Sequence, residues 1–317
     1  MRAYIIRRLL LMIPTLFLVS LIIFFLARLI PGSIIDEMLA QQQVSNYALT
    51  RGQIEHELGL DKPIYVQYGI WITDLFQGDL GDSLWSKRPV TETIFPKFPV
   101  SFELGIIGTI VGLLISIPIG VYSAVRQDSI GDYIGRGLAI AGIALPSFWL
   151  GTMVMVFPSI WWGWAPPMQY VSFFQNPGQN IQLFIIPGVI LGMGLAGVTM
   201  RMTRTMMLEV LRQDYIRTAW SKGLKERVIV FRHAMKNALI PVVTIIGLQL
   251  PVLIGGEVVL EQIFNLPGIG RLMISVIGQR DYPIIQGINL ILALVVLLIN
   301  LGVDLTYAYL DPRVHYK

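Results

Sequence analysis

Six long apolar stretches constrain the fold of this 317-residue chain more than any other feature of its sequence. A helix needs about 20 apolar residues to cross the hydrocarbon core of a bilayer, and each stretch reaches that length. One water-soluble core would not bury them all, because hydrophobic residues make up 54% of the chain and charged residues only 14%. The sequence therefore predicts an all-α polytopic membrane protein with six transmembrane helices. We expect these spans at Leu9–Ile30, Val100–Val125, Gly137–Ile160, Ile181–Met200, Ala238–Val259 and Ile284–Tyr307.

The distribution of basic residues between the spans predicts which side of the membrane each loop faces. If the N-terminus is cytoplasmic, the inner segments hold 16 Lys and Arg residues and the outer segments hold 7. Loops rich in Lys and Arg stay on the cytoplasmic side, so both termini are expected to be cytoplasmic. The first apolar run is longer than the roughly 7–15 residues of a signal-peptide core, and we interpret it as an uncleaved span.

The chain lacks the residue patterns of common catalytic and metal sites. It has no Cys, and its three His residues (His56, His233 and His315) are far apart in the sequence. Thiolate chemistry and a Cys- or His-based metal cluster are therefore not expected. The phosphate-binding pattern G-x-x-x-x-G-K-[ST] is absent, as are H-E-x-x-H and G-x-S-x-G. We expect no enzyme activity and no cofactor in this chain, so any ATP hydrolysis would take place in another subunit.

Four carboxylates lie near the ends of the predicted spans: Glu103, Glu257, Glu261 and Asp304. Ionisable groups inside a membrane are costly and are therefore candidates for function. Their positions near span ends favour an interfacial location over a role in transport. The absence of a row of carboxylates at mid-membrane argues weakly against a proton- or sodium-driven carrier, since backbone carbonyls also bind sodium.

Glycines four residues apart recur in two of the predicted spans. Gly108 and Gly112 belong to the second span, and Gly188 and Gly192 belong to the fourth. Small residues let helix backbones approach closely in lipid. The spacing fits helices that slide past one another during a transport cycle and equally fits static close packing.

Two long connections suggest how the chain is organised. Segment 31–99 is predicted to lie outside, carries nine acidic and five basic residues, and contains enough aromatic residues to form a small outer subdomain. We divide the chain into 1–99, the first span with this outer segment, and 100–317, a five-helix core. The core includes the long cytoplasmic loop 201–237.

Segment 201–237 is the most informative part of the sequence. It holds nine Lys and Arg residues against three acidic residues, and apolar residues recur at helical spacing on both sides of Gly223. The pattern predicts a helix, a glycine break and a second helix, because a glycine after a helix adopts positive φ and turns the chain. The expected apolar stripes are Leu208, Leu211, Tyr215 and Ala219 before the glycine, and Leu224, Val228, Phe231, Met235 and Leu239 after it.

Three interpretations of this basic segment remain open on the residues alone. It could lie on anionic lipid as an amphipathic helix. It could be the ordinary cytoplasmic flank of two spans, which is the simplest of the three. It could also be a helical projection that docks in the groove of a cytosolic partner. A flank needs only a few cations, however, and a helix-turn-helix of this length exceeds that need.

Motifs along nearly the whole chain resemble those of one transporter family, in the expected order and at the expected separations. They are IIRRLLLMIPTLFLVSLIIFFLARLIPG near the N-terminus, LGLDKPIYVQYGIWITDLFQGDLGDS at 58–83, RMTRTMMLEVLRQDYIRTAWSKGL at 201–224, VVLEQIFNLPGIGRLMISVIGQRDYPIIQG at 258–287 and NLGVDLTYAYLDPRV at 300–314. By these motifs the chain is similar to the B-type permease subunits of dipeptide and oligopeptide ABC importers, which depend on a substrate-binding protein.

The resemblance implies a role for the cytoplasmic loop. ABC-importer permeases mark their ATPase-docking loop with E-A-A and then Gly four residues after the last Ala. The equivalent residues here are Arg217, Thr218, Ala219 and Gly223. The Glu and the first Ala are missing, but the peptide branch reads R-T-A at this place, and Asn237 also fits that branch. The residues expected to couple to the ATPase are Asp214, Tyr215, Arg217, Thr218, Ala219, Lys222, Gly223 and Leu224.

The resemblance also implies a fold and an assembly. The fold would be that of a type I ABC importer permease in the plasma membrane of a prokaryote. The implied partners are the lipid bilayer, a second homologous permease, two cytosolic subunits that bind ATP and Mg, and an extracytoplasmic substrate-binding protein, with no nucleic acid. The outer segment 31–99 is expected to contact the second permease or the binding protein. The rival interpretation is a stand-alone secondary carrier or channel whose basic loop faces lipid.

Overall fold

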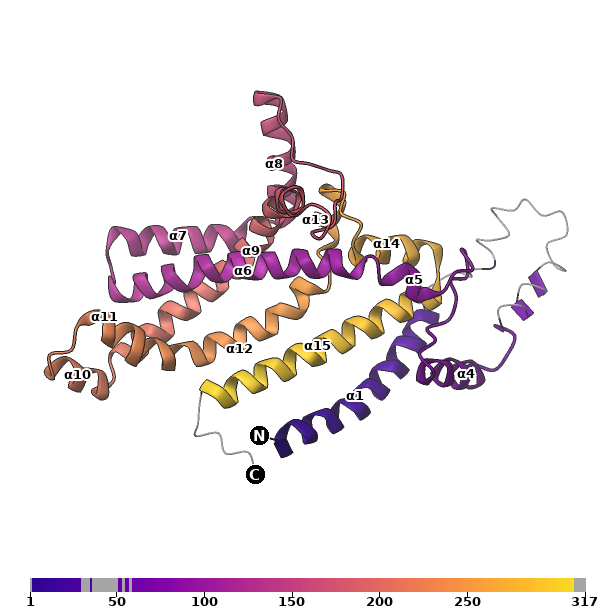
Figure 1. The fold of residues 1–317 in the computed structure, drawn as a ribbon, viewed down its shortest axis with the longest axis horizontal. Coiled ribbons are helices and arrows are strands. Elements are labelled where there is room, and N and C mark those ends of the chain that lie inside the picture. Colours follow the sequence, from indigo (N-terminus) through magenta and orange to yellow (C-terminus); the bar gives the residue numbers. More distant parts are fainter. Residues whose placement is uncertain (1, 30–34, 36–50, 53–54, 57–58, 311–317) are drawn as a thin grey trace. The chain divides into compact units, whose positions relative to one another are not determined.

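The computed structural model describes residues 2–29, 35, 51–52, 55–56 and 59–310 (Figure 1). Within these ranges the chain is almost entirely helical, and the only paired extended backbone is a single bridge between Asp82 and Pro89. The all-α class expected from the apolar stretches is therefore confirmed. Residues 30–34 and 36–50, which belong to the end of the first expected span and the outer segment, lie outside the described residues, as does the end of the chain at 311–317.

Five helical segments in the described part are long and apolar enough to cross a membrane. The fourth of them is the run Glu226–Ile263, which contains α12. The main helices of these segments are α1 (Arg2–Arg28), α6 (Phe98–Val125), α9 (Pro177–Leu211), α12 (Met235–Ile254) and α15 (Tyr282–Leu310). They match the first, second, fourth, fifth and sixth spans expected from the sequence, with differences of several residues at their ends.

The third expected span, Gly137–Ile160, is not one straight helix. It is divided into α7 (Ile130–Ala144) and α8 (Ser147–Trp162), which are bent by 95° relative to each other. The bend follows from Pro146, because the residue before a proline disfavours the helical region and proline has no N–H for the helical ladder. Leu145 accordingly has extended backbone angles. Counted as one broken span, this pair brings the number of spans to the expected six.

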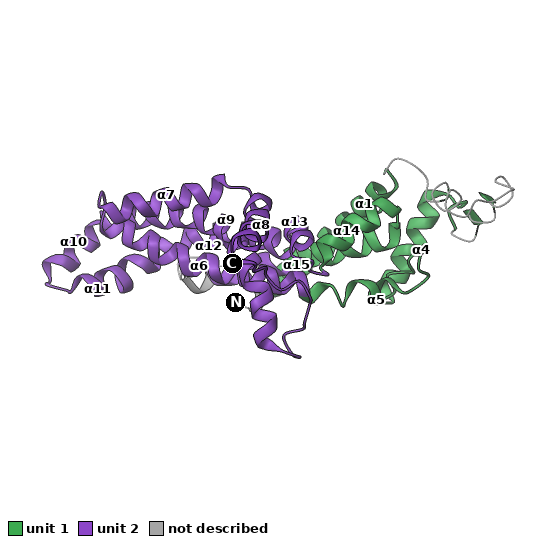
Figure 2. Ribbon diagram, turned by 90° about the horizontal axis from the view of Figure 1, so that it is seen from above, with its two compact units in different colours: residues 1–99, 268–297 green, residues 100–267, 298–317 purple. Residues whose placement is uncertain are grey.

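The chain forms two compact units (Figure 2). The first contains residues 1–99 and 268–297, and the second contains residues 100–267 and 298–317. Residues 268–297 thus group with the beginning of the chain although they are far from it in sequence. The division expected from the sequence, into the first span with its outer segment (1–99) and a five-helix core (100–317), stays a prediction.

In the first unit, a buried carboxylate joins two segments that are distant in sequence. Asp281 lies between α14 (Ile269–Gln279) and α15, and it accepts hydrogen bonds from the Ser83 hydroxyl at 2.6 Å and the Leu84 N–H at 3.2 Å. The indole N–H of Trp85 donates to the carbonyl of Gln279 at 2.7 Å. These bonds hold the loop after α4 (Ile64–Phe76) beside an apolar cluster made by α5 (Val90–Ile94), α14 and α15.

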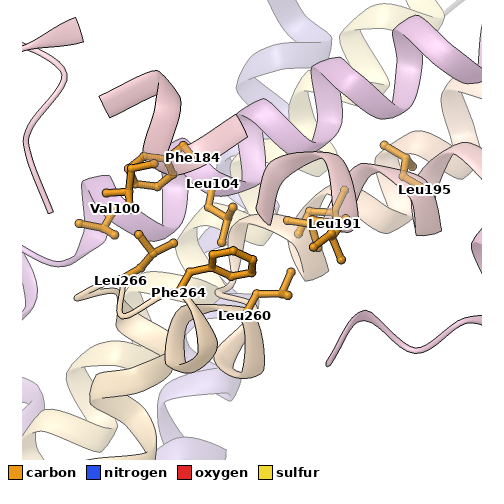
Figure 3. Close-up of a cluster of buried hydrophobic side chains, with 11 residues drawn as sticks. Val100, Leu104, Phe184, Leu191, Leu195, Leu260, Phe264 and Leu266 are labelled. Atoms are coloured by element: carbon orange, nitrogen blue, oxygen red, sulfur yellow. The ribbon is translucent and has the colours of Figure 1, made fainter. Parts of the chain in front are cut away.

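In the second unit, the main core lies where α6 and α9 meet the short helix α13 (Val258–Ile263). Figure 3 shows Leu104 of α6 and Phe184 of α9 gathered with Leu260 and Phe264, and all four side chains are buried. Partly buried residues of α8, such as Val154, pack against the same cluster. This core therefore fixes the broken segments α8 and α13 against two continuous spans.

The glycines picked out in the sequence lie where α6 and α9 cross. A Cβ atom on Gly192 would lie 2.6 Å from the carbonyl oxygen of Gly108, and one on Gly112 would lie 2.9 Å from the carbonyl oxygen of Gly192. A Cβ on Gly188 would meet the side chain of Ile107 at 2.5 Å. The close packing expected of these glycines is therefore present, and sliding of the two helices remains a hypothesis.

Glu261, one of the four carboxylates near predicted span ends, lies inside the protein, and its interfacial location stays a prediction. Its side chain is fully buried in the second unit, and it accepts a hydrogen bond of 2.5 Å from the hydroxyl of Ser101 on α6. The chain does not continue straight from α12 into α13, because Gly255 and Gly256 interrupt the helix. This break places Glu261 inside the core rather than at the end of a straight span.

Candidate coupling site

The loop between α9 and α12 folds into three short helical pieces. They are α10 (Asp214–Ser221), α11 (Glu226–Val228) and the π-helix η1 (Ile229–Ala234), which runs directly into α12 (Figure 1). α9 ends at Leu211, and Gln213 has extended backbone angles, so α10 is separate from α9. The single helix expected before Gly223 is therefore broken at residues 212–213.

α10 rests on an apolar cluster inside the second unit. Its residues Ile216 and Ala219 are buried there, while most of its other residues are exposed. The cluster joins the end of α6, the end of α9 and the beginning of α12 beneath α10. Its buried members are Val121, Ala124, Met207, Ile216, Ala219, Ile229, Val230, Ala234 and Ala238.

The apolar stripe predicted after Gly223 is wrong for Leu224, Val228 and Phe231, which are exposed, whereas its member Met235 packs against the buried cluster. Phe231 of that stripe is 54% exposed and Val228 is also exposed, whereas Ile229 and Val230 are buried. From Ile229 to Ala234 the reason is the π-helix, whose i→i+5 hydrogen bonds widen the turn and change which residues share a face. The α-helical period of 3.6 residues therefore does not predict which residues of this segment are buried together. Nothing in the sequence pattern indicates the π-helix.

Gly223 makes the sharp turn that its position predicted. Its φ is +74°, a left-handed conformation that side chains with a Cβ rarely adopt. Its N–H donates to the carbonyl of Trp220 at 2.9 Å, and the Leu224 N–H reaches the carbonyl of Ala219 at 3.4 Å. A Cβ atom at Gly223 would have no neighbour within 4 Å. The backbone conformation, and not the space around it, therefore requires glycine.

Seven of the eight predicted coupling residues are exposed, and one is not. The exposed ones are Asp214, Tyr215, Arg217, Thr218, Lys222, Gly223 and Leu224. Ala219 instead packs into the cluster beneath α10. It therefore supports α10 from below, and a larger or charged residue there would disturb the chain's own packing.

Trp220 is an exposed aromatic residue that the sequence analysis missed. It lies on α10 and is 49% exposed, next to a face on which the side chains of Asp214 and Arg217 are 96% and 75% exposed. Trp and Arg are enriched among the residues that dominate protein–protein binding. The signal in the sequence was a Trp among polar residues on a short amphipathic helix, one position after the buried Ala219.

Two polar contacts hold the loop in place. The side-chain amide of Asn237 on α12 donates to the hydroxyl of Tyr215 on α10 at 2.8 Å. Arg126, just after α6, lies 3.5 Å from the carboxylate of Glu226 on α11. Both contacts link the short helices to the ends of spans, so α10 is oriented by polar bonds as well as by its buried face.

A buried ion pair ties α7 to α9 in the same unit. The fully buried carboxylate of Asp132 accepts two hydrogen bonds of 2.8 Å from the guanidinium of Arg204, in a bidentate arrangement. The N–H of Asp128 donates to the same carboxylate at 3.1 Å, and Arg136 lies 3.4 Å from it. A buried charge needs such compensation, because an unpaired one is strongly destabilising.

The loop combines a buried base with an exposed helical face. In the part of the chain that the structure describes, no group of three His, Asp or Glu residues could hold a metal ion. The loop instead offers a short helix with an exposed polar and aromatic face, a rigid turn at its end and an apolar base that joins three spans.

Sequence comparisons identify the family. Residues 116–316 match the family described as the binding-protein-dependent transport system inner membrane component, and residues 1–105 match the N-terminal region of such membrane components. The chain belongs to this family. The match covers most of the chain and includes the whole candidate coupling site.

Full-length relatives within this family are transport permeases. The chain is 40% identical to a dipeptide transport system permease protein of Alkalihalophilus pseudofirmus and 38% identical to one of Escherichia coli, with all of each chain covered. It is 40% identical to a glutathione transport system permease protein of Pectobacterium atrosepticum over 99% of both chains. These relatives favour an importer permease over a stand-alone carrier or channel.

A solved structure shares the fold. A chain of the MetNI methionine ABC transporter, in an inward-facing conformation, aligns with a TM-score of 0.53 over 70% of this chain and 97% of that chain. The identity is 16%, so the likeness concerns the fold alone. The fold is that of a type I ABC importer permease, as the sequence motifs implied.

Proposed function

We propose that this chain is one of two transmembrane subunits of an ATP-driven importer of peptide-type substrates. The full-length relatives support this class of substrate, because both dipeptide and glutathione permeases are about equally similar to the chain. ATP and Mg are bound by separate cytosolic subunits. This chain forms half of the pathway and responds to their movement.

The exposed face of α10 is the surface that binds an ATPase subunit. The single observation that carries this proposal is the way α10 sits on its cluster. One side is buried among residues from α6, α9 and α12, and the rest of the helix presents Arg217 and Trp220 to solvent. A partner that moves α10 therefore acts on three spans at once, with no flexible linker between.

The turn and the ion pair give the loop the stiffness that coupling needs. Gly223 ends α10 sharply, so the exposed face keeps a fixed direction. The pair of Asp132 and Arg204 extends the connection from α9 to α7, which leads into the broken segment α8. Coupling of this kind requires two states that the partner contacts differently, and a stiff loop transmits that difference to the spans.

The assembly contains this chain, a second homologous permease, two cytosolic ATPase subunits and an extracytoplasmic substrate-binding protein. It lies in the plasma membrane of a prokaryote, with both termini of this chain in the cytoplasm. The basic loop then faces the ATPase subunits, in agreement with the excess of Lys and Arg in the inner segments.

Reconstitution in vesicles tests this function. The chain, purified with its co-expressed partner subunits, should accumulate labelled dipeptide only with ATP on the cytoplasmic side and the binding protein on the other. The matched control carries an ATPase subunit without its phosphate-binding lysine. Uptake by this chain alone, without any ATPase subunit, would favour the stand-alone carrier and refute the proposal.

A further inference from the structure

The first compact unit contains an apolar groove between three of its helices. α1, α4 and the first part of α15 (labelled in Figure 1) enclose a volume of about 590 Å³. Ten of the eleven residues that line it are apolar, among them Phe17 of α1, Phe76 of α4 and Leu294 of α15. The exception is Ser20. A polar ligand would find almost no hydrogen-bond partner in this groove, so its chemistry fits a hydrocarbon.

The one polar side chain in the groove is already satisfied. The hydroxyl of Ser20 donates to the carbonyl of Phe17 at 2.7 Å and shares a hydrogen bond of 3.0 Å with the hydroxyl of Tyr68 on α4. Because these bonds are internal to the unit, the groove recognises its occupant by shape and apolar surface.

The groove runs along the predicted first span, next to a cluster of aromatic rings. Phe24, Tyr68 and Trp71 contact one another with ring centroids 5.2, 5.6 and 6.1 Å apart. Tyr and Trp gather at the membrane–water interface, so this cluster marks the headgroup level. From Phe24, a rise of about 1.5 Å per residue places Ser20 about 6 Å and Ile13 about 17 Å further along α1. That depth matches half of a hydrocarbon core of about 30 Å, which is the reach of one leaflet.

A cation stands at the headgroup end of the same face of α1. The guanidinium carbon of Arg28 lies 3.5 Å from the ring centroid of Phe24, and the group donates to the side-chain oxygen of Gln67 at 2.8 and 3.2 Å. The ion pairs among the described residues do not include Arg28. A third N–H of Arg28 donates to the carbonyl of Phe24 at 3.3 Å. The donors left over are suited to a phosphate, because Arg binds phosphate through directed hydrogen bonds.

We propose that this groove binds one acyl chain of a membrane phospholipid, with the phosphate of its headgroup at Arg28. The cation at one end of the groove favours a phospholipid over an apolar helix of a partner subunit, because a helix of that kind offers Arg28 no anion. The bound lipid joins α4 to the two spans and completes the packing of the first unit.

Photolabelling of the assembled transporter tests the site. The complex is reconstituted in phosphatidylethanolamine vesicles that contain phosphatidylglycerol with a diazirine on one acyl chain, and labelled peptides are mapped by mass spectrometry. Label should concentrate on residues 13–20 and 290–294. Leu16→Trp, which fills the groove, should abolish that enrichment. Leu18→Trp is the matched control, because Leu18 lies on the same helix, is exposed and does not line the groove.

A second filling variant and a headgroup test keep the proposal falsifiable. Ile291→Trp fills the groove from α15 and should have the same effect as the α1 variant, which separates groove filling from a folding defect of α1. Arg28→Gln should lower labelling by the phosphatidylglycerol probe about fivefold and leave labelling by a diacylglycerol with the same chain unchanged.

Two results would overturn the proposal. The first is equal labelling of the groove and of the lipid-facing side of α1 at Leu18, with no effect of either filling variant. The second is a groove that is labelled in the isolated full chain and protected in the assembled transporter. That result would assign the groove to a partner subunit.

Discussion

Replacing Gly223 by valine tests whether the turn after α10 matters for coupling. A Cβ atom at this position meets nothing within 4 Å, so the substitution creates no clash. The cost is conformational, because φ is +74° and a left-handed backbone costs an ordinary L-residue about 1–2 kcal/mol, with β-branched residues at the upper end. A cost of that size changes an equilibrium by a factor of roughly 5 to 30.

The expected result is weaker binding of the ATPase subunits at normal membrane abundance of the chain. If the bound loop needs the native turn, the apparent Kd rises by up to the factor by which the native turn is depopulated. Binding is measured by titrating purified ATPase into the detergent-solubilised variant, and uptake is measured in parallel. Both should fall together.

Gly223→Asn is the control for this prediction. Asn adopts the left-handed region far more readily than valine, so it should retain most of the binding and uptake. If the valine variant binds and transports like the unchanged chain, the turn does not matter for coupling. If the asparagine variant is as defective as the valine variant, the loss does not arise from the backbone angle, and the reasoning fails.

Three further predictions concern the core and the topology. Asp132→Asn should lower the free energy of unfolding by about 3 kcal/mol, because it leaves the largely buried guanidinium of Arg204 without its counter-ion. The loss should appear as a lower melting temperature in detergent, and an unchanged melting temperature would contradict this. Gly192→Leu should destabilise the crossing of α6 and α9, whereas Gly194→Leu should be tolerated, because a Cβ at Gly194 meets nothing within 4 Å. Equal losses of melting temperature in the two variants would refute the packing argument. A single Cys at Asp82 should react with an impermeant maleimide in intact cells and one at Lys225 should not, so labelling of the latter would reverse the predicted orientation.

The sequence predicted the parts of the structure that depend on local patterns. Long apolar runs identified the helical segments, and the position of Gly223 after an amphipathic stretch indicated a left-handed turn, which the structure confirms. Glycine spacing indicated close helix packing in the second and fourth spans, and the structure shows that these glycines of α6 and α9 pack on each other. Each of these features follows from residues that are close together in the chain, or from a repeat whose period is known.

The remaining features depend on contacts between distant residues or on irregular backbone. Asp132 and Arg204 are 72 residues apart, and Ser83 and Asp281 are 198 residues apart, so no local sequence pattern predicts either pair. The π-helix changed which residues after Gly223 are buried. Ala219 was expected both in the apolar stripe before Gly223 and at the ATPase contact, because a small residue fits a tight contact with a partner as well as it fits the chain's own core; the structure buries it in that core.

The most direct test of the account is cross-linking from α10 to the ATPase subunits. The chain contains no Cys, so a thiol introduced at Arg217 or Thr218 on the exposed face is the only one in this subunit. Treatment of the assembled complex with a short bifunctional maleimide should join each of these variants to an ATPase subunit, in a yield that changes when ATP is added. A Cys at Asp82 should give no such product. If both α10 variants support full uptake yet form no cross-link to an ATPase subunit, α10 is not the coupling surface.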